Sequence, residues 1–255
     1  SFNPRFYAMG CSAGKRDSRR ERATGAWLPL DGTPGTLTSL ATLLGMDPDQ
    51  WHFVDVVSLE EEDLDQLPSC LAVILLYPQG ESTTAHMKRP PVGATPASTF
   101  FVRQLASGMC GTIAVLHALG NNLKQLGASI AEDALLRKIV VEGGGEGDAL
   151  TPDLAERSKQ LLECSALRAA HDSLATGRRG RRRHGHGQHF ITFTCVDEVL
   201  LELDGLYHGP ANRGPTSVVS FVRDAAAQVR GIIDTAKDHA THLRFSLVAL
   251  VSRSS

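Results

Sequence analysis

A cysteine at the start of an apolar helical run is the residue of this chain best suited to nucleophilic chemistry. Cys110 follows a small-residue turn, and apolar side chains recur after it at helical spacing until Asn121 and Asn122, which are typical of a helix end. The N-terminal end of a helix lowers the pKa of a thiol, and the thiolate is the reactive form. Gln104 stands six residues upstream, where its amide could reach back as an oxyanion donor.

A histidine and an aspartate far downstream can supply the general base. His189 begins an alternating aromatic and β-branched strand, and Asp204 ends another strand fifteen residues later, with a short hairpin connection at residues 196–199. Adjacent antiparallel strands bring the start of one near the end of the next, so we expect the two side chains to be neighbours. A histidine oriented by a carboxylate beside a cysteine is the base that thiol chemistry needs. The predicted catalytic residues are therefore Cys110, His189 and Asp204, with Gln104 as the oxyanion stabiliser.

The spacing of apolar residues predicts the elements that must position these side chains. Helices are expected at residues 37–44, 60–67, 110–120, 135–140, 151–164, 167–174 and 218–226. Strands are expected at residues 71–77, 189–193 and 200–203, and the resemblance described below implies two more at 51–56 and 244–250. The strand at 71–77 is apolar throughout, so both of its faces should be buried. The order of elements favours a layered α/β fold with a central sheet flanked by helices.

Several motifs, in the right order, resemble one enzyme family. The chain reads Gln-x5-Cys-Gly-Thr-Ile from Gln104, His-Phe-Ile from His189, and Glu-Leu-Asp-Gly around Asp204. Upstream it reads Trp-Leu-Pro-Leu at 27–30 and Trp-His-Phe-Val-Asp-Val at 51–56. Together these segments resemble the ubiquitin C-terminal hydrolase family of deubiquitinating cysteine proteases, over residues 26 to 252.

The resemblance implies a fold, an activity and a substrate. The implied fold is a knotted chain around a central antiparallel sheet with a papain-like active site, in one catalytic domain at residues 26–255. The implied reaction is hydrolysis of amide, ester or thioester bonds at the C-terminal glycine of ubiquitin or of the related modifier Nedd8, without a cofactor or metal. Leu28, Pro29 and Leu30 match a family segment near the bound ubiquitin. Residues 175–188 match the family's crossover loop, which favours small or unfolded leaving groups.

The composition fits one catalytic domain in a reducing compartment. A chain of 255 residues that is 42% hydrophobic can bury one full core, and it contains no apolar run long enough to span a membrane. Its five cysteines include no Cys-x-x-Cys pair, and no signal-peptide pattern opens the sequence. We therefore expect a monomer in the cytoplasm or nucleus.

The net charge of −2 hides two basic segments in an acidic body. Residues 1–26 carry six basic and two acidic groups, and residues 178–183 add five arginines. The remaining residues carry 15 basic and 26 acidic groups, a net charge of −11, which favours encounter with a basic partner such as ubiquitin. Residues 1–25 are expected to be a disordered basic extension, in which Met9-Gly10-Cys11 resembles an acylated start.

Two motifs admit a functional and a plain interpretation. The arginines at 178–183 could tune leaving-group choice or contact an acidic partner, but charge runs are usually solvated and disordered, which we favour. His184, His186 and His189 invite a metal site, yet no cysteine or acid lies nearby in sequence to complete four ligands. His117 lies about 10 Å along the helix from Cys110, too far to be its base, so a hydrogen-bonded packing role is expected.

Other classes of function remain as alternatives to the protease. The chain could be a non-hydrolytic ubiquitin-binding module whose catalytic residues are misaligned. A nucleic-acid binder led by the arginine run is disfavoured, because no aromatic residue lies between positions 102 and 189 to stack on bases.

Overall fold

A six-stranded antiparallel sheet forms the centre of the molecule. The computed structural model describes residues 27–79, 90–142, 154–175, 188–235 and 244–253. The strands follow the order β1-β6-β2-β3-β4-β5, and every neighbouring pair is antiparallel. Their bounds are β1 Trp51–Asp55, β2 Cys70–Pro78, β3 Gln188–Val196, β4 Val199–Leu203, β5 Ala211–Pro215 and β6 Ser246–Ser252. The predicted central antiparallel sheet is confirmed, while the knotted path stays a prediction.

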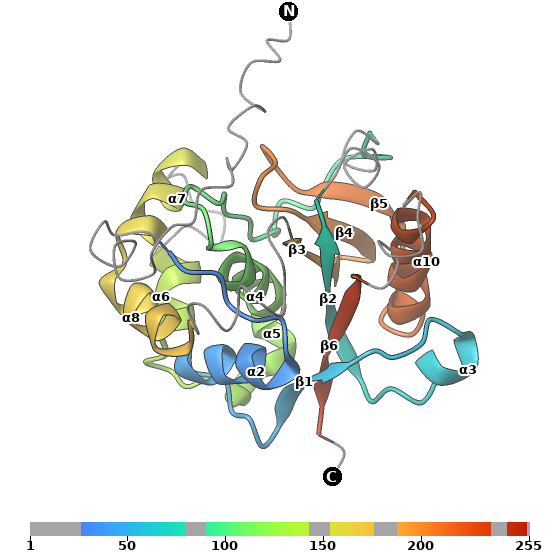
Figure 1. The fold of residues 1–255 in the computed structure, drawn as a ribbon, viewed down its shortest axis with the longest axis horizontal. Coiled ribbons are helices and arrows are strands. Elements are labelled where there is room, and N and C mark those ends of the chain that lie inside the picture. Colours follow the sequence, from blue (N-terminus) through green and yellow to red (C-terminus); the bar gives the residue numbers. More distant parts are fainter. Residues whose placement is uncertain (1–26, 80–89, 143–153, 176–187, 236–243, 254–255) are drawn as a thin grey trace, which may run out of the picture.

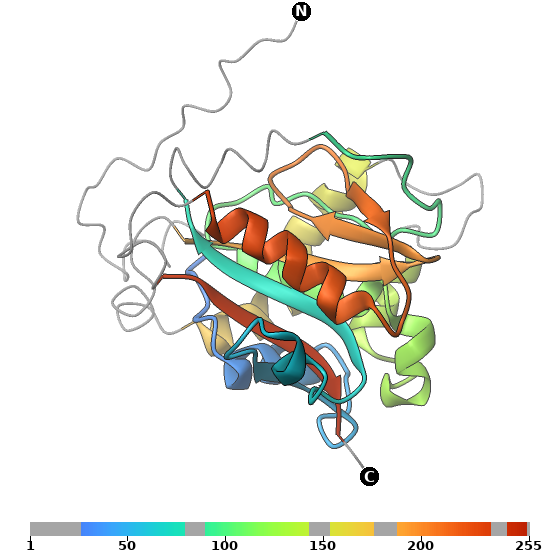
Figure 2. The same cartoon turned by 90° about the vertical axis from the view of Figure 1, so that its right-hand side faces the viewer.

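Helices cover both faces of this sheet (Figures 1 and 2). One face carries α2 Pro34–Leu43, α4 Cys110–Gly120, α5 Leu123–Leu126, a 3-10 turn at Gly127–Ser129, α6 Leu135–Glu142, α7 Leu154–Glu163 and α8 Ser165–Leu174. The other carries α10 Phe221–Ile233, which lies across the sheet in Figure 2, and the short acidic helix α3 Glu61–Leu64. Two hydrophobic clusters fill the spaces on either side of the sheet. The layered arrangement of helices around the sheet is therefore confirmed as well.

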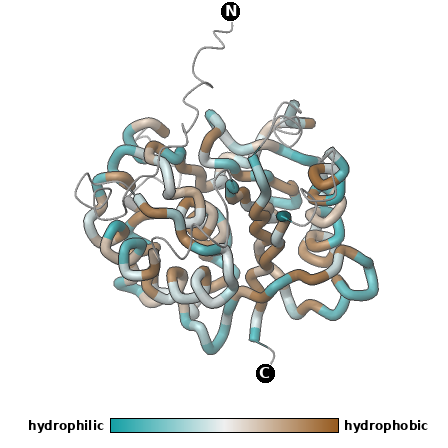
Figure 3. The backbone as a smooth tube through the Cα atoms, viewed as in Figure 1, coloured by the Kyte–Doolittle hydropathy of each residue, from teal (hydrophilic) through white to brown (hydrophobic). Residues whose placement is uncertain are grey.

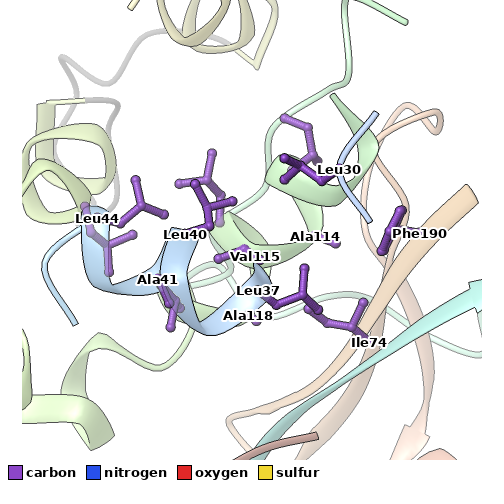
Figure 4. Close-up of a cluster of buried hydrophobic side chains, with 14 of the residues drawn as sticks. Leu30, Leu37, Leu40, Ala41, Leu44, Ile74, Ala114, Val115, Ala118 and Phe190 are labelled. Atoms are coloured by element: carbon purple, nitrogen blue, oxygen red, sulfur yellow. The ribbon is translucent and has the colours of Figure 1, made fainter. Parts of the chain in front are cut away.

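Helix α4 lies at the centre of the larger cluster. The sequence predicts one buried stripe, but all eleven residues of α4 are buried. The reason is that α4 is enclosed, with α2 on one side and the sheet on the other (Figure 4). The labelled side chains that meet around it are Leu30, Leu37, Leu40, Ala41, Leu44, Ile74, Ala114, Val115, Ala118 and Phe190. A helix held on all sides gives its first residue a fixed place.

Strand β2 is the most hydrophobic strand of the sheet. All nine of its residues are buried, which confirms the prediction from its unbroken apolar run. Figure 3 shows hydrophobic residues gathered along the central strands, whereas α3 is largely hydrophilic. Within the described ranges, no helix combines the length and the apolar character that crossing a membrane requires.

The start of the last long helix differs from the prediction. Val218 and Val219 were expected on its buried face, but they lie in the preceding turn and are 69% and 94% exposed. Ser217 and Ser220 exchange hydrogen bonds of 3.1 Å between backbone N–H and side-chain oxygen, which fixes this turn. The buried face of α10 begins instead at Phe221.

Some predictions concern residues outside the described ranges. These are the basic extension at 1–25, the helix start at Thr151 and Pro152, the arginine run at 178–183, and the histidines at 184 and 186. They stay predictions.

Candidate active site

The β3–β4 hairpin brings a histidine and an aspartate together. Its two-residue turn has left-handed backbone at Asp197 and Glu198, with φ of 46° and 60°, as a tight hairpin requires. The resulting register pairs Thr192 with Leu203, so that the start of β3 meets the residue after β4. His189 Nε2 lies 2.7 Å from Asp204 Oδ1, and both side chains are buried. The prediction that they are neighbours is confirmed.

Further contacts hold this pair in place. The backbone N–H of Leu206 donates to Asp204 Oδ1 at 2.9 Å, so the carboxylate is fixed by its own turn. Tyr77 pairs with His189 across β2 and β3, and the two rings meet edge to face at 5.8 Å. Sequence reasoning missed Tyr77, although its position within a fully buried strand marks it as a polar residue with a special neighbour.

Cys110 is the first residue of α4 and is almost fully buried, with 9% exposed. Met109, which precedes the helix, makes no side-chain cap hydrogen bond, so the first N–H groups of α4 are not taken up by a capping side chain. The Cys110 thiol lies close enough to the imidazole of His189 to favour its protonated form. Because Nε2 of His189 is used by Asp204, Nδ1 is the nitrogen that remains for the thiol. The structure thus brings Cys110, His189 and Asp204 together at one place, while their catalytic roles stay predictions.

The charge state of His189 follows from these neighbours. Burial alone disfavours the imidazolium, but the charge and hydrogen bond of Asp204, helped by Cys110, raise the pKa of His189 to about 10. His189 is therefore protonated at neutral pH. A buried imidazolium beside a thiol stabilises the thiolate, which is the nucleophile.

Gln104 contacts the turn that follows Asp204. Its backbone N–H donates to the carbonyl of Gly205 at 2.8 Å, and its side-chain Nε2 donates to the carbonyl of Ala106 at 3.1 Å. The amide group has two N–H bonds, so this contact orients the side chain while one N–H stays available. Gly205 fits flush against α4, since a Cβ there would lie 2.8 Å from Ile113 Cγ2 and 3.1 Å from Gln104 Cβ. A glycine is thus required between Asp204 and the segment that carries Gln104.

The segment expected near bound ubiquitin is largely internal here. Leu28 and Leu30 are each 2% exposed and belong to the core around α4, and Leu30 lies against Gly111. Pro29 is the partly exposed residue of the three. Direct side-chain contact with a partner would require the two leucines to move, so their binding role stays a prediction.

The remaining candidate residues are structural. His117 is fully buried, lies 3.1 Å from the carbonyl of Val102 and stacks on Phe101, which confirms the predicted packing role. Burial raises the pKa of the Cys70 thiol to about 12, so this cysteine is inert. Among the residues that the structure describes, no group of three or more histidine, cysteine or acidic side chains could hold a metal ion.

Comparison with known proteins bears directly on this site. The model of a family described as ubiquitin carboxyl-terminal hydrolase, family 1, matches residues 27–234. Human ubiquitin carboxyl-terminal hydrolase isozyme L1 is 32% identical over 227 residues, which cover 87% of this chain and 96% of that protein. A ubiquitin carboxyl-terminal hydrolase of Drosophila melanogaster is 30% identical over 236 residues, 89% of this chain and 97% of its own.

A solved structure with the same fold agrees. The catalytic domain of Trichinella spiralis UCH37, crystallised bound to ubiquitin vinyl methyl ester, superposes with a TM-score of 0.72 at 20% sequence identity. The match covers 89% of this chain and 96% of that one. The family model, the relatives at 30% identity or more and the shared fold coincide on the part of the chain that holds Cys110, His189 and Asp204. The chain belongs to the ubiquitin carboxyl-terminal hydrolase family.

Proposed function

We propose that this chain is a deubiquitinating cysteine protease that hydrolyses amide, ester or thioester bonds at the C-terminal glycine of ubiquitin. Family membership supports this function. The observation that carries it is the buried His189–Asp204 hydrogen bond of 2.7 Å, set beside a cysteine at a helix N-terminus. No other arrangement of this kind involves the cysteines that the structure describes. His189 is already paired with Asp204, and nothing favours a non-hydrolytic binding module.

The first half of the reaction forms a thioester. The Cys110 thiolate attacks the carbonyl carbon of the terminal glycine, a C–S bond forms, and the carbonyl electron pair moves to oxygen. The backbone N–H of Cys110 and the Gln104 amide stabilise this oxyanion, each contributing on the order of 3 kcal/mol. His189 then gives its Nδ1 proton to the leaving amine, alcohol or thiol as the bond to it breaks.

The second half returns the enzyme to its starting state. Water attacks the thioester, and neutral His189 takes the proton of the water. Collapse of the tetrahedral intermediate expels the Cys110 thiolate and releases the ubiquitin carboxylate. Asp204 holds the imidazole ring in place and stabilises its cation at each stage, as the 2.7 Å bond to Nε2 supports.

Finer features of the activity are proposals that rest on the family resemblance. They are a preference for small or unfolded leaving groups, action on Nedd8 as well as ubiquitin, docking of ubiquitin near Pro29, and a monomer that works in the cytoplasm or nucleus. The net charge of −11 outside the two basic segments supports a basic partner.

A hydrolysis assay with two cysteine variants tests the function. The substrate is ubiquitin with a fluorophore in amide linkage to its C-terminal carboxylate. Release is expected from the native chain and from Cys164→Ser, a control cysteine at the N-cap of α8, but not from Cys110→Ala. Release by Cys110→Ala would contradict the assigned nucleophile. No release by the native chain with ubiquitin binding intact would favour the binding module, and loss of both would refute the proposal. The same assay with Nedd8 ranks the two modifiers.

A further inference from the structure

A second buried histidine touches the active-site helix but takes no part in the reaction. His171 lies on α8 and is fully buried. Its Nε2 lies 2.7 Å from the carbonyl oxygen of Leu28, and its Nδ1 lies 2.8 Å from the hydroxyl of Thr112. Thr112 belongs to the first turn of α4, two residues after Cys110. The imidazole therefore bridges the 27–30 segment and the turn that carries the nucleophile.

The direction of each hydrogen bond in this bridge is fixed by chemistry. A carbonyl oxygen can only accept, so Nε2 of His171 must carry the proton that bonds Leu28. Burial lowers the pKa of His171 to about 4, even though the Leu28 carbonyl acts in the opposite direction, so the ring is neutral at pH 7. A neutral ring protonated at Nε2 has an accepting Nδ1, and the Thr112 hydroxyl must donate to it.

Other contacts press the 27–30 segment against the same turn. The Trp27 ring meets His171 edge to face at 4.6 Å, and the guanidinium of Arg168 lies 4.8 Å from the centre of the Trp27 ring. Gly108, with φ of 88°, approaches so closely that a Cβ there would lie 2.2 Å from the Trp27 carbonyl oxygen. The 27–30 segment thus contacts Gly108, which precedes Cys110, and is linked through His171 to Thr112, which follows Cys110.

This bridge matters because the start of α4 lacks the usual support. Met109 makes no side-chain cap hydrogen bond, as expected where the first N–H groups must face a thiolate and an oxyanion. The orientation of that turn must then be set from its side. Thr112 is the polar side chain of the first turn, and His171 is its partner.

We propose that His171 is a positioning residue, which fixes the first turn of α4 and the Cys110 thiol against the 27–30 segment through the directed chain Thr112–His171–Leu28. This deepens the proposed function, on which it rests for its catalytic meaning. It makes the nucleophile sensitive to the segment that we expect near bound ubiquitin.

The first test measures the reactivity of Cys110 without any ubiquitin. The rate of alkylation by iodoacetamide is followed by mass spectrometry of the peptide that contains Cys110. Thr112→Val removes the donating hydroxyl at equal volume and should slow alkylation roughly tenfold, since a small misplacement of a reacting group is amplified in rate. Thr112→Ser restores the hydroxyl and should react within about twofold of the native chain.

A matched control separates positioning from general stability. Thr194 is also fully buried, and its hydroxyl bonds the Leu71 carbonyl at 3.0 Å and Asn122 Nδ2 at 2.9 Å, just beyond the far end of α4. Thr194→Val should lower the denaturation midpoint as Thr112→Val does, while Cys110 keeps its native alkylation rate. Equal slowing by both valine variants, or by neither, would overturn the proposal.

Steady-state kinetics on the fluorogenic ubiquitin add a second readout. Thr112→Val should lower kcat with KM unchanged, whereas His171→Phe, which also releases Leu28, should lower kcat and raise KM. The double variant should have the same kcat and KM as His171→Phe alone, because both changes break the same series of hydrogen bonds. If the losses in kcat from the two changes were fully additive, Thr112 and His171 would not act through the same hydrogen bonds. If the native chain fails to cleave ubiquitin while the alkylation pattern holds, the proposed function falls and the positioning role stands.

A measurement on the native chain covers variants that fail to fold. Long-range ¹⁵N–¹H spectra report which ring nitrogen of a histidine carries the proton. The proposal requires the Nε2–H tautomer of His171 at pH 7. The Nδ1–H tautomer, or an imidazolium, would reverse the hydrogen bonds and overturn it.

Discussion

Two histidines flank the nucleophile, and both are buried, yet their electrostatics are opposite. His189 bonds a carboxylate, and its pKa rises to about 10. His171 bonds a backbone carbonyl through the same ring nitrogen, and its pKa falls to about 4. Burial disfavours the cation in both, so the partner decides the outcome. The comparison teaches that a buried histidine can take part in acid–base chemistry or act as a neutral connector, according to a single neighbouring group.

The largest effect should come from making the partner of His189 neutral. Asp204→Asn keeps the shape of the side chain but removes the charge that offsets burial, so His189 becomes electrostatically like His171. We expect kcat on fluorogenic ubiquitin to fall on the order of a thousandfold, with the circular dichroism spectrum unchanged. Activity within threefold of the native chain would remove Asp204 from its assigned role.

The pH dependence of activity should sharpen the same contrast. The pKa of His189 is raised, so its imidazolium is fully formed at neutral pH and is lost only as the pH rises through about 10. The alkaline limb of kcat/KM in the native chain should therefore lie near pH 10. In Asp204→Asn it should move to lower pH, because the largest contribution that opposes the effect of burial on the pKa of His189 is then lost. An alkaline limb that is the same in both proteins would assign it to another group.

The position of Asp204 can also be disturbed without changing any charge, through the close packing of Gly205 beside it. Gly205, the residue after Asp204, lies against Ile113 and Gln104. A Cβ at this position would lie 2.8 Å from Ile113 Cγ2. Gly205→Ala should lower the free energy of unfolding by up to about 3 kcal/mol and reduce kcat. Gly209→Ala is the matched control, because a Cβ there meets nothing within 4 Å. Chemical denaturation and kcat of the two variants should differ clearly, and equal behaviour would show that the close contact is unimportant.

Sequence reasoning could find one of these histidines and not the other. His189 and Asp204 lie together at the open end of a hairpin, and both the strands and the two-residue turn can be read from local pattern. The partners of His171 come from segments 59 and 143 residues away, and their meeting depends on how α8 packs against α4. Five of the six strands, most helices and the pairing of His189 with Asp204 were therefore predictable, since they follow local periodicity and motif order, whereas strand β5 was not predicted. The full burial of α4, the internal place of Leu28 and the Gly205 junction required the packed structure.

The last prediction concerns stability and separates the histidines by sign. Because the pKa of His171 is lowered, its contribution to stability is complete above pH 6.5 and is lost as the pH falls toward 4. Because the pKa of His189 is raised, its contribution is complete below pH 6.5 and is lost as the pH rises through about 10. Between pH 7 and pH 5, His171 should therefore account for a loss of about 2 kcal/mol in the free energy of unfolding.

Urea denaturation of the native chain and of His171→Phe at pH 7 and pH 5 measures this difference. Phenylalanine does not titrate, so the variant should lose less stability than the native chain over the same interval, although its free energy of unfolding at pH 7 is lower. His117, whose pKa is also lowered by burial to about 4, remains in both proteins and cancels in the comparison. If acid destabilised the variant as much as the native chain, His171 would take up a proton between pH 7 and pH 5 as readily in the folded state as in the unfolded state. It would then not be the neutral connector that the contrast with His189 requires.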